Sequence, residues 1–210
     1  MRADGETRLG ASALRAGREE VLAAARAISA ERLVVGSVGN VSLRLGDTVI
    51  VTPTRVPYSR MTPDDLVPVT VAGTSLGSGQ RPSRELALHL GVYRDRPDVG
   101  AVIHTHSPHA TAWSFLGEPL PSTEEGDYYE IGPVMTSPPA PSGSDELASA
   151  AARCLAGSAA VLLGQHGVLA AAPTLDRCLD VARVIEHQAQ IAWLLRGQRP
   201  GASWGDLPRI

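Results

Sequence analysis

The sequence predicts a layered α/β domain. Three observations support this class: some segments repeat apolar residues at helical steps, short apolar runs of strand character lie between them, and 210 residues suit one core. Single hydrophobic cores grow to roughly 250 residues before chains divide into domains. We therefore expect one domain over residues 1–210, with tails at 1–11 and 197–210 that are flexible or cover an interface.

The chain is expected to open with a helix and a hairpin. Over residues 12–30 the apolar residues recur at three- and four-residue steps, as on one face of an amphipathic helix. Two short strands, 41–45 and 48–52, then flank Gly46-Asp47, a pair that favours a tight turn.

A short helix, a strand and a longer helix follow. Residues 62–65 have the cap, the early proline and the acidic first turn of a short helix, and 66–71 is the next strand. The Gly/Ser-rich segment 73–82 is a loop. It ends at Ser83, a good N-cap for a helix that runs to about Arg94.

The remainder continues the alternation of strands and helices. We expect a strand at 99–106, a helix at 108–115 and then a long loop at 116–143 that contains a short strand at 134–136. A helix from Ser144 and a strand at 160–163 follow. A turn at 165–167, a strand at 168–171 and a helix at 175–195 complete the chain. A loop as long as the one at 116–143 is typical of a functional segment.

The basic side chains exclude several classes of enzyme. All 19 of them are arginines, because the chain contains no lysine. Schiff-base aldolases, pyridoxal-phosphate enzymes and P-loop ATPases each need a lysine as nucleophile or phosphate ligand, so they are excluded. The net charge of −3 gives no basic excess of the kind that nucleic-acid binding requires.

No apolar run reaches the roughly 18 to 20 residues that a membrane helix needs, and residues 1–10 are charged rather than signal-like. We therefore expect a cytoplasmic protein without a membrane partner. The two cysteines, Cys154 and Cys178, fall in predicted helices and are read as small buried residues, since two thiols cannot form a disulfide framework or a four-ligand zinc site.

The strongest chemical signal is a pair of histidines at the end of a predicted strand. His104 and His106 point to the same face, roughly 6.5 to 7 Å apart at Cα, so both can reach one metal ion. His166, in the turn at 165–167, is the best candidate for a third ligand, and His109 is the alternative. Three neutral imidazoles with one open position are typical of a catalytic zinc site.

Glu85 and two further histidines have competing interpretations. Glu85 lies in the first turn of its predicted helix, where it either complements the helix dipole or acts as a general base or displaceable metal ligand. His89, one turn later, either orients Glu85 or is an ordinary core residue. For His187, a packing or surface role is favoured over ligation.

These residues occur in one order with other short motifs. The motifs are Gly39-Asn40-Val41-Ser42, Thr52-Pro53-Thr54, Pro82-Ser83-x-Glu85, Arg96-Pro97-Asp98-Val99, Val102-x-His104-Thr105-His106-Ser107 and Gln165-His166-Gly167. With them the chain resembles the class II aldolase/adducin family over about residues 12–195. The resemblance implies a three-layer fold with a central, mostly antiparallel sheet flanked by helices, and a homotetramer with active sites at subunit interfaces.

The resemblance also implies roles for single residues. His104, His106 and His166 would hold one zinc ion per chain, or another divalent metal, and Glu85 would be the catalytic acid and base. The residues that match phosphate-binding positions are Asn40, Thr54 and Ser83. The implied reaction is a retro-aldol cleavage of a short ketose 1-phosphate, through a metal-bound enediolate, to dihydroxyacetone phosphate and an aldehyde.

Two arginines depart from the pattern of the sugar-phosphate aldolases in this family. Those enzymes have a glycine after Thr54 and a second serine after Ser83, where this chain has Arg55 and Arg84. Arginine offers a rigid fork to phosphate or carboxylate, or it simply fills the site. Either the substrate anion is bound differently here or it is a different anion, and we expect Arg55 and Arg84 among the residues that bind it.

Tyrosines are a second point of difference. An aldolase of this family uses one tyrosine from its C-terminal tail and one from a mid-chain loop. Here the loop contains Tyr128 and Tyr129, but the tail offers only Trp204. We expect Tyr128 to be the catalytic tyrosine.

Three functions remain open at the level of sequence. The first is the zinc-dependent aldolase, and the second is a metal-dependent decarboxylase or dehydratase of a related sugar acid or sugar phosphate. The third is an adducin-like interaction protein without catalysis, which the presence of three histidines and Glu85 disfavours.

Overall fold

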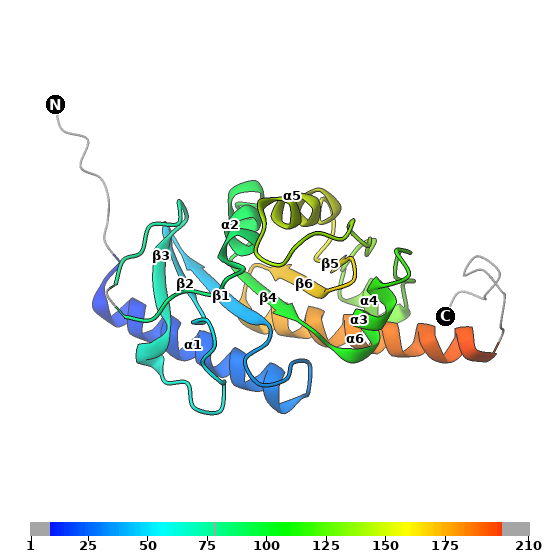
Figure 1. Cartoon of the computed structure of the whole chain (residues 1–210), viewed down its shortest axis with the longest axis horizontal. Coiled ribbons are helices and arrows are strands. Elements are labelled where there is room, and N and C mark those ends of the chain that lie inside the picture. The colour runs from blue at the N-terminus through cyan, green and yellow to red at the C-terminus, as the bar shows by residue number, and fades with distance from the viewer. Residues whose placement is uncertain (1–8, 78, 199–210) are drawn as a thin grey trace.

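Six strands form one antiparallel sheet in the computed structural model, which describes residues 9–77 and 79–198 (Figure 1). The strands are β1 (Asn40–Leu45), β2 (Thr48–Val51), β3 (Val67–Thr70), β4 (Ala101–Thr105), β5 (Ala160–Leu163) and β6 (Gly167–Ala172). Their order across the sheet is β3-β2-β1-β4-β6-β5, and each neighbouring pair is antiparallel. The α/β class and the antiparallel sheet are therefore confirmed.

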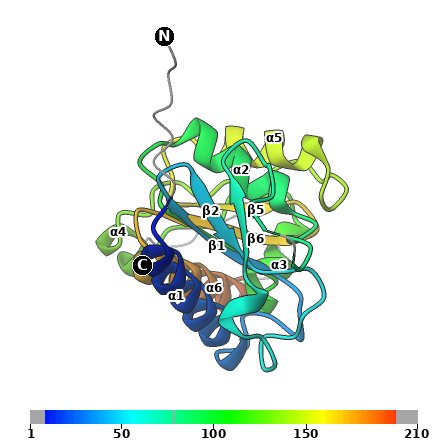
Figure 2. The same ribbon diagram turned by 90° about the vertical axis from the view of Figure 1, so that its left-hand side faces the viewer.

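Helices cover both faces of this sheet. They are α1 (Ala11–Ala30), the 3-10 helix η1 (Pro63–Asp65), α2 (Leu86–Asp95), α3 (Pro108–Ser114), α4 (Glu124–Tyr128), α5 (Asp145–Cys154) and α6 (Leu175–Gln198). Figure 2 shows the sheet between α2 and α5 on one side and α1 and α6 on the other. The predicted three layers are thus confirmed.

The strands are apolar along their whole length because both faces are buried. In β4, Ile103 belongs to the core on the side of α1, α3 and α6, while its neighbour Val102 belongs to the core under α2 and α5. Successive side chains point to opposite faces of a strand, so each strand contributes to both cores. All five residues of β4 and all six of β6 are buried, so polar side chains on these strands, such as His104, are shielded from solvent.

The helix expected from Ser83 begins later than predicted. Glu85 occupies the N-cap position and Leu86 is the first residue of α2. The Ser83 hydroxyl accepts a hydrogen bond from the Glu85 backbone N–H at 3.2 Å, which closes a turn before the helix instead of capping it. Glu85 makes no side-chain capping bond, so the dipole interpretation does not account for where its carboxylate points.

The long loop contains structure that the sequence did not predict. The single turn α4 lies within it, and the expected strand at 134–136 is reduced to two isolated bridges, Leu120 to Val134 and Thr136 to Leu162. Short elements in a proline-rich segment lack a period long enough to recognise. Both cysteines are free thiols in helices. Cys178 is buried as predicted, whereas Cys154 is only partly buried.

Most of the predicted tails, 1–8 and 199–210, lie outside the described residues, and so does Trp204. Within the described part, Ala11 already begins α1 and α6 continues to Gln198, so both tails are shorter than expected. None of the described helices combines the length and the hydropathy that a membrane span requires.

Gly39 lets β1 approach the central strand β4. Its φ is +81°, and a Cβ there would lie 2.7 Å from the carbonyl oxygen of His104 and 2.7 Å from Cγ1 of Val34. We expect Gly39→Ala to lower the free energy of unfolding by about 2–4 kcal/mol in urea titrations, through backbone strain plus overlap. Gly46→Ala is the control, because Gly46 has φ +63° but open space around it, and should cost about 1 kcal/mol. Equal losses would contradict the close approach.

Candidate metal centre and active site

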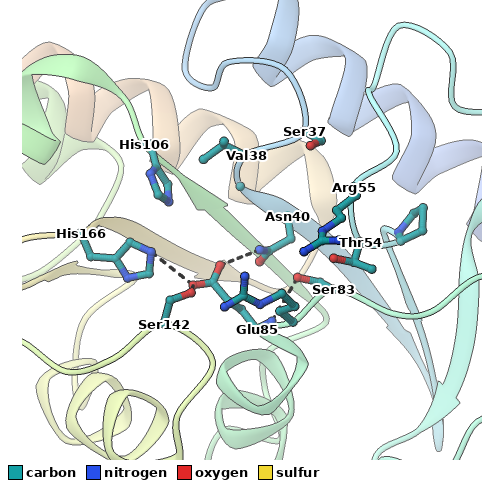
Figure 3. Close-up of a pocket in the computed structure, with 13 residues that line it drawn as sticks. Ser37, Val38, Asn40, Thr54, Arg55, Ser83, Glu85, His106, Ser142 and His166 are labelled. Carbon is teal, nitrogen blue, oxygen red and sulfur yellow. Dashed lines mark hydrogen bonds and ion pairs between the residues drawn. The ribbon is translucent and has the colours of Figure 1, made fainter.

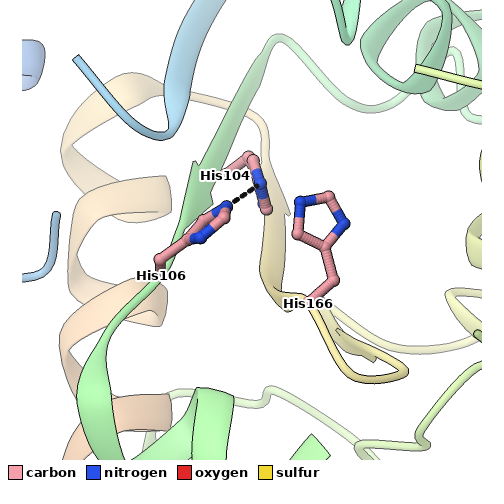
Figure 4. A group of neighbouring side chains, drawn as sticks. All are labelled: His104, His106 and His166. Atoms are coloured by element: carbon pink, nitrogen blue, oxygen red, sulfur yellow. Dashed lines mark hydrogen bonds between the residues drawn. The ribbon is translucent and has the colours of Figure 1, made fainter. Parts of the chain in front are cut away.

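Three histidines converge at one end of the sheet, as predicted (Figure 4). His104 lies on β4, His106 directly follows that strand, and His166 lies in the turn between β5 and β6. One nitrogen from each ring lies within 4.8 Å of the corresponding nitrogens of the other two rings. Because β6 pairs with β4, the turn before β6 is brought to the end of β4, and this pairing supplies the third imidazole.

The protonation of these rings suits a metal. Nδ1 of His104 lies 2.7 Å from the carbonyl oxygen of Val168, which can only accept, so Nδ1 carries the proton and Nε2 presents a lone pair. That Nε2 is 2.9 Å from Nε2 of His106. Burial, reinforced by the neighbouring imidazoles, lowers the pKa of His106 to about 3 and also lowers the pKa of His104.

Neutral imidazoles are the form that binds metal ions. Because Nε2 of His104 and Nε2 of His106 are only 2.9 Å apart, a cation or a shared proton must lie between them. Three nitrogen donors with space on the fourth side are the donor set of catalytic zinc sites. The residues present therefore fit a divalent metal.

Glu85 adds a carboxylate to this cluster, with only 6% of its surface exposed. Its Oε2 accepts a hydrogen bond from Nδ2 of Asn40 at 2.8 Å, and its Oε1 accepts one from the Ser142 hydroxyl at 2.8 Å. Nε2 of His104 and Nε2 of His166 each lie 3.2 Å from one of the two oxygens. Burial alone would raise the pKa of Glu85, but the hydrogen bonds from His166, Ser142 and Asn40 outweigh it and hold the pKa below its usual range.

A cavity of ≈ 260 Å³ joins the cluster to a polar wall (Figure 3). His106, His166, Glu85 and Ser142 line one side of it. The predicted substrate-binding residues all line it too, namely Asn40, Thr54, Arg55, Ser83 and Arg84. The structure thus brings these five residues together at one cavity, and their role in phosphate binding stays a prediction.

The two arginines of this wall have no partner in the described part of the chain. Neither the Arg55 nor the Arg84 guanidinium makes a hydrogen bond or ion pair with residues 9–77 or 79–198. Arg55 also has φ +63°, a left-handed conformation that costs an arginine about 1–2 kcal/mol. Among the described residues Glu85 is the only acidic one that lines the cavity, so the wall that carries Arg55 and Arg84 is positively charged.

Ser142 is the site residue that sequence reasoning missed. It lies in the long loop, and the neighbouring Gly143, with φ +78°, lets that loop approach the Arg84 backbone closely. The Ser-Gly pair before the N-cap Ser144 was the only signal, and such pairs mark many ordinary turns.

Other candidate residues lie elsewhere. Tyr128 is 81% exposed on α4 and is absent from the lining of the cavity. His109 pairs with Glu186 at 2.7 Å, and His187 is exposed, so neither joins the three-histidine cluster. The Arg177 guanidinium packs over the Tyr129 ring, with its central carbon 4.9 Å from the ring centre.

Comparison with known proteins identifies the class. Residues 19–193 match the family model described as "Class II Aldolase and Adducin N-terminal domain". The family match and the aldolase relatives identify the chain as a lyase of the aldolase type, and its three clustered histidines, two of which line the cavity with Glu85, agree with that class. The chain belongs to the class II aldolase and adducin family.

Individual relatives are similar over most of their length. The 5-methylthioribulose-1-phosphate/5-deoxyribulose-1-phosphate aldolase of Rhodospirillum rubrum is 34% identical over 182 residues, which are 84% of this chain and 80% of the relative. The L-fuculose phosphate aldolase of Escherichia coli K12 is 34% identical over 161 residues, 74% of this chain and 73% of the relative. A solved structure of L-fuculose 1-phosphate aldolase superposes with a TM-score of 0.86 at 27% identity, covering 97% of this chain and 94% of that one.

Proposed function

We propose that this enzyme is a zinc-dependent aldolase that cleaves a short ketose 1-phosphate to dihydroxyacetone phosphate and an aldehyde. The observation that carries the proposal is a cluster of three imidazoles, two of which line one cavity beside the Glu85 carboxylate, with two arginines unpaired among the described residues on the other side of that cavity. The names of the relatives support the substrate class, because each of those enzymes acts on a phosphorylated ketose.

The polar wall would bind the phosphate end. Asn40, Thr54 and Ser83 offer short polar side chains, while Arg55 and Arg84 offer two full positive charges. Two guanidinium groups balance a dianionic phosphate, and each can donate two parallel hydrogen bonds to it. This wall orients the substrate so that its ketone faces the histidines.

His104, His106 and His166 would hold the zinc ion, which supplies a Lewis acid that stabilises negative charge on the ketone oxygen as the C3–C4 bond breaks. Glu85 would handle the proton of the adjacent carbon. In the synthetic direction it removes that proton, and in the cleavage direction it returns it to the same carbon.

The hydrogen bonds of Glu85 indicate which of its oxygens holds the proton. The Asn40 amide nitrogen can only donate, so Oε2 keeps its lone pair while that bond persists. The Ser142 hydroxyl can rotate and accept, so Oε1 can carry a proton and donate it to Ser142. Oε1 is therefore the oxygen we assign to proton transfer.

Tyr128 would transfer the second proton of the reaction. In the cleavage direction it takes the proton from the hydroxyl that becomes the aldehyde oxygen, and in the synthetic direction it returns that proton. Because Tyr128 is exposed on α4 and does not line the cavity of its own chain, this role requires that it reach the cavity of a neighbouring copy. The homotetramer with interface active sites stays a prediction, and so does the cytoplasmic location. Size-exclusion chromatography with light scattering would measure the number of chains directly.

A substrate panel tests the proposed reaction. The zinc-loaded enzyme is incubated with L-fuculose 1-phosphate, 5-deoxyribulose 1-phosphate, 5-methylthioribulose 1-phosphate and a set of 3-keto sugar-acid phosphates. Release of dihydroxyacetone phosphate from a ketose 1-phosphate supports the aldolase. Release of carbon dioxide from the keto acids alone would favour the decarboxylase instead, and no turnover of any compound would contradict both.

Arg55 allows a prediction in which stability and affinity change in opposite directions. Arg55→Gly should raise the free energy of unfolding by about 1 kcal/mol, because glycine adopts φ +63° without strain. It should also raise KM for the ketose phosphate about 10- to 100-fold, through loss of a charge-assisted hydrogen bond. Urea unfolding and steady-state kinetics measure the two effects.

The exposed Arg60 provides the matched control, since it lies near Arg55 in sequence and outside the cavity lining. Arg60→Ala removes one positive charge without touching the polar wall, and KM should stay within about twofold of the wild type. An unchanged KM in Arg55→Gly would remove Arg55 from the phosphate site.

A further inference from the structure

A line of buried hydrogen bonds runs from Glu85 into the core beneath α2. Asn40 donates to Glu85, and the Asn40 side-chain oxygen contacts Nε2 of His89. Nδ1 of His89 lies 2.6 Å from the Ser42 hydroxyl, which lies 2.7 Å from the Tyr93 hydroxyl. The exposed fractions of Asn40, Ser42, His89 and Tyr93 are 3, 0, 0 and 1%, so water does not compete for these groups.

Elementary hydrogen-bond chemistry assigns a direction to every bond in this line. The Glu85 carboxylate is an acceptor, so the Asn40 amide must present its NH2 group to it and its oxygen to His89. That oxygen can only accept, so Nε2 of His89 must carry a proton. In a neutral imidazole Nδ1 is then an acceptor, so Ser42 donates to His89 and Tyr93 donates to Ser42.

The opposite tautomer of His89 would conflict with Glu85. A proton on Nδ1 would leave the Nε2 lone pair facing the Asn40 oxygen, and the amide would relieve that repulsion by turning over. It would then direct its oxygen at the Glu85 carboxylate, two acceptors in a site with 6% exposure. Unpaired acceptors in a buried site cost about 1–3 kcal/mol each, so one proton arrangement is strongly preferred.

We propose that His89 is a positioning residue, which acts through Asn40 to hold the Asn40 NH2 group against Glu85 Oε2. This inference rests on the proposed role of Glu85 in proton transfer. It resolves the two interpretations of His89, because the ring is buried like a core residue and still orients the carboxylate, although it does not touch it. Ser42 holds the tautomer of His89, while Tyr93 contacts Ser42 and not His89 in this line and lies farthest from the chemistry.

The first experiment measures the proton directly. Imidazole nitrogen chemical shifts are recorded by NMR on the zinc-loaded, 15N-labelled enzyme, whose six histidines make a simple spectrum. The signals missing from His89→Gln identify His89. We expect a protonated Nε2 and an unprotonated Nδ1, and the reverse tautomer would overturn the proposal even if the protein had no aldolase activity.

The second experiment compares three variants. His89→Leu removes the donor to Asn40 and should lower kcat about 10- to 100-fold, with KM and zinc content unchanged. His89→Gln keeps one N–H donor in that region and should recover most of the loss. Tyr93→Phe removes only the far end of the line and should keep kcat within about threefold of the wild type.

These results separate positioning from general stability, because Tyr93 is as deeply buried as His89. An unchanged kcat in His89→Leu would overturn the proposal, and so would equal losses in all three variants. Should the panel of ketose phosphates give no turnover, the proposed function fails, while the NMR tautomer still decides the direction of the hydrogen bonds.

Discussion

Glu85→Gln is expected to leave zinc bound and to lower kcat about 100- to 10,000-fold, the usual range for removing a general acid or base. Glutamine has the same shape, so its amide can still pair with Asn40 and Ser142 and keep the cavity intact. It cannot take up a proton at neutral pH, and proton transfer at the substrate carbon is then left to water. Kinetics on the substrate found by the panel, together with zinc analysis, measures both parts of the result.

Glu186→Gln is the matched control for this substitution. Glu186 also pairs with a histidine, His109, but it lies outside the cavity. The same chemical change there should leave kcat within about threefold, because no step of the reaction reaches it. Normal turnover in Glu85→Gln would exclude Glu85 from proton transfer, and loss of zinc in that variant would make it a metal ligand instead.

Removal of a histidine ligand is expected to abolish zinc binding and activity together. His104→Ala and His166→Ala should each weaken zinc affinity by more than about 100-fold, since even outer-shell partners contribute 10- to 100-fold. Elemental analysis after dialysis should find about one zinc per wild-type chain and little in either variant. His166 has a side chain 14% exposed in a turn, so His166→Ala should stay folded even if the fully buried His104 does not tolerate alanine.

His187→Ala serves as the control for histidine loss, because His187 is exposed on α6, away from the cluster. It should bind zinc like the wild type. Wild-type protein that contains no metal after purification in zinc-supplemented buffer, with activity unaffected by His104→Ala, would contradict the metal-dependent mechanism.

Local patterns were sufficient to predict most of the fold. The strands were recognisable because burial on both faces makes them continuously apolar, and the hairpin was recognisable from its Gly-Asp turn. The pair His104 and His106 followed from the alternation of a single strand, which needs no knowledge of the tertiary structure. The predicted start of α2 was wrong, because a serine hydroxyl near a backbone N–H can close a turn as well as cap a helix.

Contacts between distant segments could not be derived in this way. Asn40 and Glu85 are 45 positions apart, and Ser142 is 57 positions from Glu85. Their meeting depends on how β1, α2 and the long loop pack, and no local period encodes that packing. His89 shows the same limit: its helical spacing from Glu85 indicated that it orients Glu85 or is a core residue, but could not show that Asn40 connects the two side chains.

Asn40 and His104 are direct partners in the register of β1 and β4, the two central strands of the sheet. Central strands are usually the last segments to open, and their amide hydrogens exchange with solvent only when the whole domain unfolds. The residue proposed to steer the carboxylate and a proposed metal ligand therefore belong to one cooperative unit. Local opening elsewhere in the domain would therefore leave these two residues paired.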